Sequence, residues 1–352
     1  MSEHTDPTGA RPAASSTPRR LVRRFFLNRA DRQLAIRMEA GLAEVERSVL
    51  EQAGSADPVV DAVGRYLVSA GGKRVRPLLT LLAAQLGDGA TPDVVAAATV
   101  VELTHVASLY HDDVMDDADL RRGVPTAQRA WGNSVAILAG DILFSRASQL
   151  IAPLGQDALQ LQASTFARLC QGQLHETLGP ADGADPIEFY LQVLADKTGS
   201  LIAAAAEFGV LVSGAPVEYR RPLRDFGEAI GVAFQLVDDV IDMRSTEDES
   251  GKVPGTDLRD GVPTMPWLLL RREAEHDSHA ADTVRRVEAL LADDVTLPQA
   301  LAVLAADPAT DETLRRAREW KTKATDALVP LPAGPVKQAL VELAEYIVDR
   351  SK

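Results

Sequence analysis

Residues 91–123 read TPDVVAAATVVELTHVASLYHDDVMDDADLRRG, and this stretch decides the fold. Thr91 suits the cap of a helix, because its side chain can accept a hydrogen bond from a backbone N–H of the first turn, and Pro92 fits the first helical position. The residues that follow are apolar on nearly every side of a helical period, as in a helix buried at the centre of a protein. The stretch predicts a central helix that ends in a run of aspartates.

The rest of the chain also has the periodicity of helices. Apolar residues recur at three- and four-residue steps over 31–53, and Gly54 predicts the end of that helix. Further helices are expected at 134–154, 158–177, 186–213 and 223–243, with loops at 277–280 and 329–335. No segment alternates as a strand does, and the Gly, Pro and Asp clusters fall between helices. We expect a single all-α domain.

Composition narrows the class of protein. The 352 residues are 46% apolar and 5% aromatic, which allows a large core and favours helices over strands. The formal net charge of −14 argues against a general nucleic-acid binder. The one cysteine, Cys170, indicates a reducing compartment. With no secretory signal and no apolar run near the roughly 20 residues of a membrane span, we expect a cytoplasmic protein, with a peripheral membrane contact left open.

The N-terminal region differs from the rest. Residues 1–18 are rich in Ser, Thr, Pro and Ala without periodicity, which predicts a disordered tail. Residues 19–33 are rich in Arg with interleaved apolar residues, so an amphipathic helix on a membrane surface is one interpretation. The alternative is a solvated segment packed on the protein body or on a partner subunit. The expected helical domain covers 34–352.

Two acidic motifs share one spacing. Because four residues turn a helix by about 400°, Asp112 and Asp116 lie on one face, as do Asp238 and Asp242 in FQLVDDVIDM. Carboxylates beside apolar helices are costly to desolvate and raise one another's pKa, unless a cation binds them. A solvated helix end is the alternative for one copy. A calcium loop does not fit, because the central Gly and closing Glu are missing.

Two copies favour Mg²⁺, which prefers oxygen ligands and shares its coordination sphere with substrate phosphates. Two such helices facing each other across a cavity would suit a diphosphate. Basic residues at turn-like positions would complete that site. These are Lys73, Arg74 and Arg76 after two glycines, Arg121 and Arg122 after the first motif, Lys197 beside Thr198, and Lys252 after the second motif. His105 lies one heptad before Asp112, so the two residues share roughly one helix face. We therefore interpret His105 as a diphosphate contact, with an ordinary core histidine as the alternative.

These motifs together resemble the trans-isoprenyl diphosphate synthases, the head-to-tail polyprenyl diphosphate synthases of the class I isoprenoid synthase fold. The resemblance runs from about residue 34 to the C-terminus. Its motifs come in the family's order: GGKRVRP at 71–77, ELTHVASLYHDDVMDDADLRRGVPT at 102–126, GQ at 172–173, DKTGSL at 196–201, FQLVDDVID at 234–242 and GKVPGTDLRDGVPTMP at 251–266. The implied fold is a single large helical bundle around a central cavity. The implied partners are isopentenyl diphosphate, an allylic prenyl diphosphate, Mg²⁺ and a second copy of the chain.

The resemblance also implies roles for individual residues. Asp112, Asp116 and Asp238 would bind Mg²⁺, and Asp113, Asp239 and Asp242 would support them. Isopentenyl diphosphate would contact Lys73, Arg76, His105 and Arg122. The allylic diphosphate would contact Arg121, Lys197, Thr198, Gln235 and Lys252, with Gln173 lining the same site. The sequence departs from the family pattern at TMP (264–266), where TLP is usual, and at Thr256, where Lys or Ser is frequent.

The implied reaction needs no nucleophilic side chain. Cations stabilise the departing pyrophosphate, the double bond of isopentenyl diphosphate attacks the allylic cation, and a proton is then lost to pyrophosphate. In the family, bulky residues before the first motif close the product tunnel. Here Ala107 and Ser108 are small, which favours a product longer than four isoprene units, such as a quinone side-chain precursor. A stop at geranylgeranyl diphosphate is the alternative, with Thr104 or Leu103 as a deeper floor.

Two other classes of protein share the fold. A class I terpene cyclase carries an Asn/Asp–Ser–Glu pattern as its second motif, whereas this chain has DDVID, and it needs no isopentenyl site such as GGKRVRP. A non-catalytic subunit of a heteromeric synthase typically lacks motif residues that are present here. A catalytic subunit that needs a partner stays open. The broad apolar helices predict a buried subunit interface, with a homodimer as the expected state.

Overall fold

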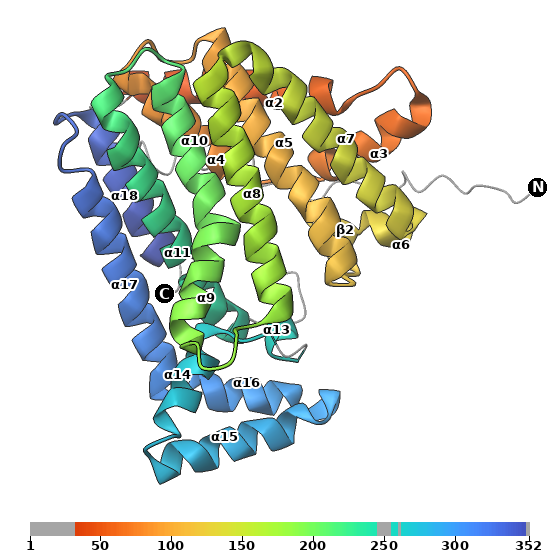
Figure 1. The fold of residues 1–352 in the computed structure, drawn as a ribbon, viewed down its shortest axis with the longest axis vertical. Coiled ribbons are helices and arrows are strands. Elements are labelled where there is room, and N and C mark those ends of the chain that lie inside the picture. Colours follow the sequence, from red (N-terminus) through yellow and green to blue (C-terminus); the bar gives the residue numbers. More distant parts are fainter. Residues whose placement is uncertain (1–31, 245–254, 260–261, 350–352) are drawn as a thin grey trace, which may run out of the picture. The chain divides into compact units, whose positions relative to one another are not determined.

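The computed structural model describes residues 32–244, 255–259 and 262–349 (Figure 1). The predicted tail, nearly all of the Arg-rich segment and Lys252 lie outside these residues. The described chain divides into two compact units. The first unit contains residues up to Ala163 with Ala204–Arg220 and Gly334–Ala339, and the second contains Ser164–Ala203, Arg221–Ala333 and the residues from Leu340 on. The domain boundaries expected from the sequence stay a prediction.

The first unit is built around α5. Its helices are α2 (Arg32–Ala53), α3 (Pro58–Ser69), α4 (Val75–Ala83), α5 (Pro92–Met115), α6 (Ala127–Trp131) and α7 (Asn133–Ile151), with 3₁₀ turns η2 (Ala84–Leu86), η3 (Ala152–Leu154) and η5 (Val217–Tyr219). Helices α8 (Gln156–Leu178) and α10 (Ser200–Leu211) have residues in both units. Helix α5 packs against α2, α4 and α7, so it is a core helix, as the sequence predicted.

Local chemistry fixes both ends of α5. The Thr91 hydroxyl accepts a hydrogen bond from the backbone N–H of Val94 at 3.3 Å, which confirms the predicted cap. Near the other end, the fully buried Tyr110 hydroxyl donates to the Val63 carbonyl at 2.5 Å and accepts from the Leu67 backbone N–H at 3.2 Å. Both partners belong to α3. The last turn of α5, which carries the first acidic motif, is therefore tied to a neighbouring helix.

A short hairpin follows α5, although no strand was predicted. Strands β1 (Leu120–Arg121) and β2 (Val124–Pro125) pair antiparallel. Arg122 and Gly123 form the turn between them, and both have positive φ angles, 55° and 78°. Two positive φ angles are what a tight two-residue hairpin requires. Strands of two residues are too short to show alternation, which is why the sequence pattern missed them.

The second unit contains the second acidic motif on α11. Its elements are α9 (Pro186–Leu194), the π-helical turn η4 (Ala195–Gly199), α11 (Arg220–Arg244), α13 (Thr256–Arg259), α14 (Met265–Glu273), α15 (Ser278–Leu291), η6 (Asp294–Thr296), α16 (Leu297–Ala305), α17 (Pro308–Ala327) and α18 (Pro335–Asp349). Arg220, the first residue of α11, belongs to the first unit, as do the first residues of α18. Helix α14 packs against α9, α15 and α17, and α15 packs against α16.

One expected helix has an irregular middle, and one expected loop was wrong. The segment expected as a helix over 186–213 is helical from Pro186 to Leu211, but Ala195–Gly199 form a π-helical turn, which inserts an extra residue into the helical path. The loop expected at 277–280 is the start of α15. Asp277 caps that helix by accepting from the Ala280 backbone N–H at 2.8 Å. Polar residues there mark a helix cap and not a loop.

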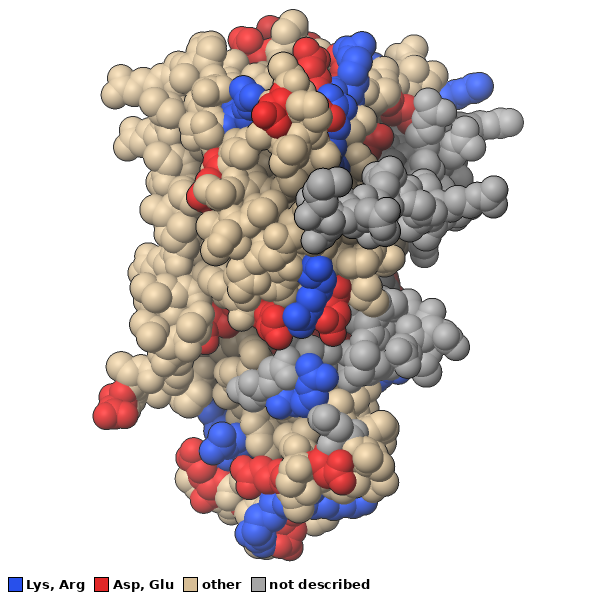
Figure 2. Space-filling view, turned by 90° about the vertical axis from the view of Figure 1, so that its right-hand side faces the viewer, with Lys and Arg blue, Asp and Glu red and all other residues tan. Residues whose placement is uncertain are grey.

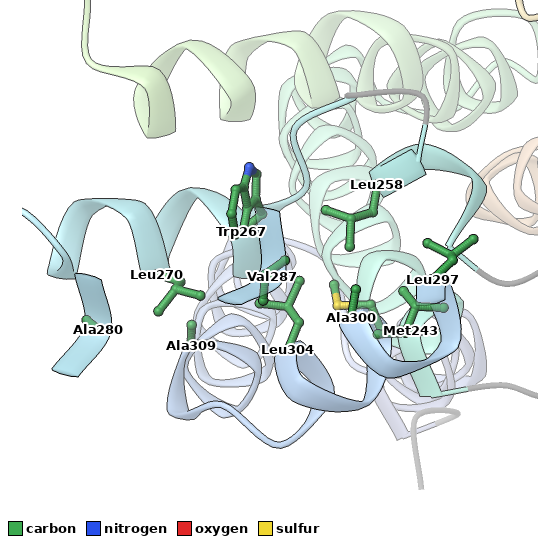
Figure 3. Packing of buried hydrophobic residues seen from close by; sticks show 11 residues of the cluster. Met243, Leu258, Trp267, Leu270, Ala280, Val287, Leu297, Ala300, Leu304 and Ala309 are labelled. Carbon is green, nitrogen blue, oxygen red and sulfur yellow. The ribbon is translucent and has the colours of Figure 1, made fainter. Parts of the chain in front are cut away.

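A buried apolar cluster joins α11, α13, α14, α15, α16 and α17 (Figure 3). Figure 3 shows side chains from these helices gathered in one layer, with Ala280 at its left end and Met243 and Leu297 at its right end. Val287 and Leu304 are completely buried in it. Burial of these side chains is the main stabilising force for this end of the second unit.

Two helices reach the length and mean hydropathy of a membrane span, although no span was predicted from the sequence. One is α5, and the other is α7 continued through η3 to Leu154. Of the apolar window, 67% is buried in α5 but only 33% in α7. Burial explains the hydropathy of α5, whereas α7 keeps an exposed apolar face that needs another explanation.

Charged side chains of both signs are interspersed over the described residues on the face shown in Figure 2. Lys and Arg side chains there lie beside Asp and Glu side chains. Such a surface differs from the continuous basic surface that a phosphate backbone requires.

Replacing Val287 by Ala tests the cluster of the second unit. Val287 is fully buried, so its loss should lower the free energy of unfolding by about 2 kcal/mol through lost apolar burial and a residual cavity. Val295→Ala is the matched control, because that valine is 80% exposed. Equal urea midpoints for the two variants would contradict the packing described.

Candidate active site

The first acidic motif occupies the last turn of α5. Asp112 is half-buried and Asp116, the C-cap residue, is exposed. The backbone N–H of Asp116 donates to the Asp112 carbonyl at 2.8 Å, so the helical turn between them is intact. The two carboxylates therefore sit one above the other on one face, as the spacing predicted.

Asp113 has a different position from its neighbour. Its side chain is completely buried, and its Oδ1 accepts from Arg121 Nε at 2.7 Å. The hairpin places Arg121 there, because it lies on β1 directly after the motif. A buried carboxylate needs a cation and hydrogen bonds to compensate for lost hydration. Asp113 is thus an anchor for the turn that carries Asp112 and Asp116.

A cluster of four arginines lies at the same end of the first unit. Arg74 is buried and donates to Glu102 Oε1 at 2.7 Å and to Glu46 Oε1 at 3.2 Å. Arg122 is half-buried and donates to the Leu67 carbonyl at 2.7 Å. We call Arg74, Arg76, Arg121 and Arg122 the arginine cluster.

Arg76 and Arg122 differ from Arg74 and Arg121 in having no ion pair with another described residue. The Nε of Arg76 is also buried and has no hydrogen-bond acceptor among the described residues. Burial lowers the pKa of Arg76, and the charge of Glu102 only partly opposes that effect. Burial also lowers the pKa of Arg122, to about 10. Cations that are partly withdrawn from water without full compensation are suited to bind an anion.

His105 lies among these arginines. Its pKa is held well below 6.5, first by burial and then by the charges of Arg76 and Arg122, with Arg74 and Arg121 adding to them. The imidazole is therefore neutral at pH 7, when it has one N–H donor and one acceptor nitrogen. A neutral donor beside fixed guanidinium groups suits a bound anion.

Backbone strain is concentrated around this site. Among the described residues, the only non-glycine residues with positive φ are Arg74 (53°), Asp117 (48°) and Arg122 (55°). Two of them belong to the arginine cluster and the third follows Asp116. Gly72, with φ of 155°, leaves space for two of these arginine side chains. A Cβ at this position would lie 2.8 Å from Arg74 Nη1 and 3.2 Å from Arg122 Nη2. Such strain collects where a site fixes its geometry.

The second acidic motif repeats the anchoring of the first. Asp239 is 5% exposed, and its two carboxylate oxygens accept from the Tyr190 hydroxyl at 3.0 and 2.8 Å. The Met265 backbone N–H, at the start of α14, donates to Asp239 Oδ2 at 3.0 Å. Asp238 is half-buried, and Asp242 Oδ2 accepts from the Gly255 backbone N–H at 3.0 Å. The middle aspartate again holds its motif in place.

The TMP departure at 264–266 has a structural role here. Met265 is the first residue of α14, so its N–H points out of the helix start and is available to Asp239. A methionine and a leucine offer the same backbone donor. The side chain of Thr256, the other departure, lies outside the described residues.

Lys197 stands on the π-helical turn η4. It forms an ion pair with Glu176 of α8, and both side chains are partly exposed. Thr198 is nearly buried beside it. Gln173, one turn before Glu176 on α8, has a buried Oε1 that lacks a donor among the described residues. Gln235 is half-buried on α11.

The structure groups the predicted residues by unit. Lys73, Arg76, His105, Asp112, Asp113, Asp116, Arg121 and Arg122 are in the first unit, and Gln173, Lys197, Thr198, Gln235, Asp238, Asp239 and Asp242 are in the second. Lys73 is exposed, whereas its neighbour Arg74 is buried. The assigned roles of all these residues stay predictions.

Ala107 and Ser108 differ in their surroundings. Ala107 is fully buried, whereas Ser108 is half-buried and donates to the His105 carbonyl at 2.8 Å. One turn earlier, the buried Thr104 hydroxyl accepts from Gln162 Nε2 at 2.7 Å. Of the two small residues, Ser108 is therefore the one that can take a larger side chain without overpacking the core.

Sequence reasoning missed the partners that hold the functional groups. Glu102, Glu176 and Tyr190 were not singled out. Glu102 had a signal, since a carboxylate inside an otherwise apolar helix implies a buried cation. Glu176 and Tyr190 had none, because each meets a residue far away in the sequence.

Magnesium fits the chemistry of these donors. Asp112 and Asp116 present oxygen ligands on one helix face, which suits Mg²⁺. Among the described residues, no group of three or more His, Cys, Asp or Glu side chains is close enough to hold a metal ion by itself. A cation bound to either motif would therefore take its remaining ligands from water and from a bound phosphate group.

The polyprenyl synthetase family profile matches residues 57–304. Nonaprenyl diphosphate synthase of Mycobacterium tuberculosis is 44% identical over 327 residues, covering 91% of this chain and 95% of that protein.

Solved structures give the same result. A decaprenyl diphosphate synthase from Rhodobacter capsulatus superposes with a TM-score of 0.80 at 35% identity, covering 91% of this chain and 99% of that chain. Geranylgeranyl pyrophosphate synthase from Corynebacterium glutamicum, complexed with calcium and isoprenyl diphosphate, gives 0.79 at 41% identity, with 91% and 98% covered. The expected fold of the isoprenoid synthase type is confirmed.

The pKa of His105 predicts a pH dependence of stability. Since the folded-state pKa is below about 6.5, the unfolded chain binds a proton more readily, so the contribution of His105 is complete above about pH 6.5 and is lost as the pH falls. Urea unfolding of wild type and His105→Gln between pH 5 and 8 measures it. Wild type should lose stability relative to the variant as the pH drops from 7 to 5. The exposed His279→Gln controls for loss of an imidazole, and a pH-independent difference at His105 would contradict the prediction.

Proposed function

The chain belongs to the polyprenyl synthetase family and is a prenyltransferase, and from this premise we propose that it joins isopentenyl diphosphate to an allylic diphosphate. The product is an all-trans polyprenyl diphosphate longer than four isoprene units. The observation that carries the proposal is the arginine cluster around a neutral His105, with a buried guanidinium nitrogen that lacks an acceptor. A diphosphate supplies the negative charge and the acceptor oxygens that this cluster lacks.

We assign isopentenyl diphosphate to the arginine cluster. Arg76 and Arg122 are the cations directed to it, and His105 adds a neutral hydrogen-bond donor. Arg74 has a supporting part, because Glu102 and Glu46 already take up its hydrogen bonds. This division leaves a net positive site whose geometry is set before substrate arrives, which reduces the cost of ordering on binding.

We assign the allylic diphosphate to the acidic motifs and to Lys197. Asp112, Asp116 and Asp238 would hold Mg²⁺, which when bound would neutralise the charge of the departing pyrophosphate. Asp113 and Asp239 keep these carboxylates in place through Arg121 and Tyr190. Lys197 contributes a further charge for the same diphosphate. The reaction requires no nucleophilic side chain, and apolar walls that exclude water protect the cationic intermediate.

The product length follows from the wall of α5 near the first motif. The half-buried Ser108 leaves room where an aromatic residue would stop a growing chain, and the small Ala107 adds no bulk beside it. The relatives include a nonaprenyl and a decaprenyl diphosphate synthase, whose products exceed four units, and a geranylgeranyl pyrophosphate synthase, whose product has four. The small residues favour the longer product, and the four-unit product is the competing outcome.

An elongation assay tests the function directly. Purified protein with Mg²⁺ and isopentenyl diphosphate should extend farnesyl diphosphate to products beyond four units, sized by chromatography. Asp112→Asn should lower the rate on the order of 100-fold or more, because a metal ligand is lost. Asp117→Asn, in the same acidic run but paired with Arg129, is the control and should retain activity. Cyclic hydrocarbons as products, or no elongation by folded wild type, would contradict the proposal.

A phenylalanine at position 108 should shorten the product. Ser108→Phe adds a bulky ring to a half-buried position, so chain growth should stop at fewer units while the rate of the first condensation is kept. Leu109→Phe, about 100° around the helix, is the matched control and should leave the length unchanged. Identical product ladders for wild type and Ser108→Phe would place the floor of the tunnel elsewhere.

We further propose that the chain forms a homodimer through the exposed apolar face of α7. Ile137 is 42% exposed and Leu138 59%, and Leu159 at the start of α8 in the same unit is 45% exposed. A group of exposed apolar side chains on neighbouring helices marks a surface that another molecule can cover. A second copy covers the same face on both chains by two-fold symmetry.

Sedimentation equilibrium tests the homodimer. Wild type should have twice the mass of one chain at micromolar concentration, and Leu138→Arg should reduce the mass to that of one chain because it buries an unpaired charge in the interface. Val59→Arg alters an exposed valine on α3 and should leave the dimer intact. A monomeric wild type would overturn the proposal.

A further inference from the structure

Three residues on one face of α8 all contact the π-helical turn of the second unit. Arg168, Gly172 and Glu176 are spaced by four, so they lie along a single line of the helix. Arg168 bonds the carboxylate of Asp196, Gly172 lies against the turn's backbone, and Glu176 pairs with the Lys197 ammonium. Three successive turns of α8 therefore each contact a different part of the π-helical turn Ala195–Gly199.

Arg168 is the centre of this network. Its Nε donates to Asp196 Oδ1 at 2.7 Å, its Nη1 donates to Glu228 Oε2 of α11 at 2.7 Å, and its Nη2 approaches the Ala195 carbonyl at 3.5 Å. The second oxygen of Asp196 accepts from Gln192 Nε2 at 2.8 Å. Although burial alone lowers the pKa of Arg168, the two carboxylates outweigh it and raise that pKa. The guanidinium thus bridges α8, the turn and α11.

Glycines allow the turn to approach both helices closely. A Cβ on Gly172 would lie 2.8 Å from the Lys197 backbone nitrogen, and one on Gly231 of α11 would lie 2.6 Å from the Gly199 Cα. Contacts this short leave no room for a side chain, so the turn's backbone is confined on two sides. The backbone is confined by glycines, and its direction is fixed by the Arg168 network.

The π-helical turn is sensitive to loss of such a clamp. A π turn holds one residue more than an α-helical turn, and it is rare and occurs mostly as a single turn inside an α-helix. Shifting the extra residue by one position would rotate the following side chains by about 100° around the axis. Lys197 and Thr198 would then point in another direction. Removing Arg168 would also leave the 4% exposed Asp196 without its cation.

We propose that Arg168 is a positioning residue for Lys197. It fixes Asp196, holds the π-helical turn in its register between α8 and α11, and so directs the Lys197 ammonium to the diphosphate. Glu176 keeps that ammonium in place until the diphosphate replaces it. This inference rests on the proposed function, because Lys197 is assigned there to the allylic diphosphate.

Steady-state kinetics of Arg168→Met, with farnesyl diphosphate and isopentenyl diphosphate varied separately, test the inference. The KM for farnesyl diphosphate should rise about tenfold, as expected for a displaced charge, while the KM for isopentenyl diphosphate stays within about twofold. Arg168→Lys should recover part of the loss, because one ammonium can pair with Asp196 but cannot form the two-sided contact of a guanidinium.

A double-mutant cycle with Lys197 separates positioning from general stability. In a Lys197→Ala background, Arg168→Met should raise the KM for farnesyl diphosphate no further, since the group that it positions is already gone. Independent, multiplying effects would overturn the inference. Glu228→Gln, which weakens the hold on Arg168 while keeping the shape, should raise the same KM by a smaller factor, and it serves if Arg168→Met does not fold.

Arg220 provides a matched control in the first unit. It also bridges two carboxylates, Glu207 at 3.0 Å and Asp157 at 3.2 Å, one of them buried. Arg220→Met should lower the thermal midpoint but leave both KM values unchanged. A rise in the farnesyl diphosphate KM equal to that of Arg168→Met would show that any lost arginine bridge has this effect, and would overturn the inference. Wild type that elongates no primer would instead overturn the proposed function.

Discussion

The cost of burying a carboxylate is the constraint on which both acidic motifs depend. Each motif places its middle aspartate, Asp113 or Asp239, in the protein interior, where the loss of hydration must be offset by a cation or by hydrogen bonds. Arg121 does this for the first, and the Tyr190 hydroxyl with the start of α14 does it for the second. The buried aspartates fix their helix turns, so the neighbouring carboxylates are positioned before a metal or substrate binds. Mutation of either partner would act on the site through the aspartate it compensates.

The arginine cluster poses the opposite problem, an excess of buried positive charge. Glu102 compensates Arg74, while burial lowers the pKa values of Arg76, Arg122 and His105, and the neighbouring arginines lower those of Arg122 and His105 further. The positive φ angles of Arg74 and Arg122 show that the backbone is also strained there. In the proposed isopentenyl diphosphate site, a bound diphosphate would offset the excess positive charge that lowers stability in the free protein, while the strained backbone would hold the arginines in place. The arginine cluster would thus supply both the attraction for the diphosphate and the preformed geometry of its site.

The π-helical turn shows how a site can depend on residues that never touch the substrate. Lys197 was recognisable from DKTGSL, but its direction depends on one extra residue in the turn and on a guanidinium two helical turns before Glu176 on α8. The four-residue spacing of Arg168, Gly172 and Glu176 was visible in the sequence. Its meaning was not, because the spacing does not show which segment the face contacts.

The sequence alone determined the helical class, the cap of α5 at Thr91 and the shared faces within each acidic motif. These features depend on neighbours within four residues, where backbone geometry fixes the outcome. Tertiary structure decided which aspartate of each pair is buried, which arginine keeps a counter-charge, and where 186–213 breaks into two helices around a π turn. Those outcomes depend on contacts such as Asp239 with Tyr190, which join residues distant in the chain. A one-dimensional pattern records which side chains share a helix face, but only packing decides what that face meets.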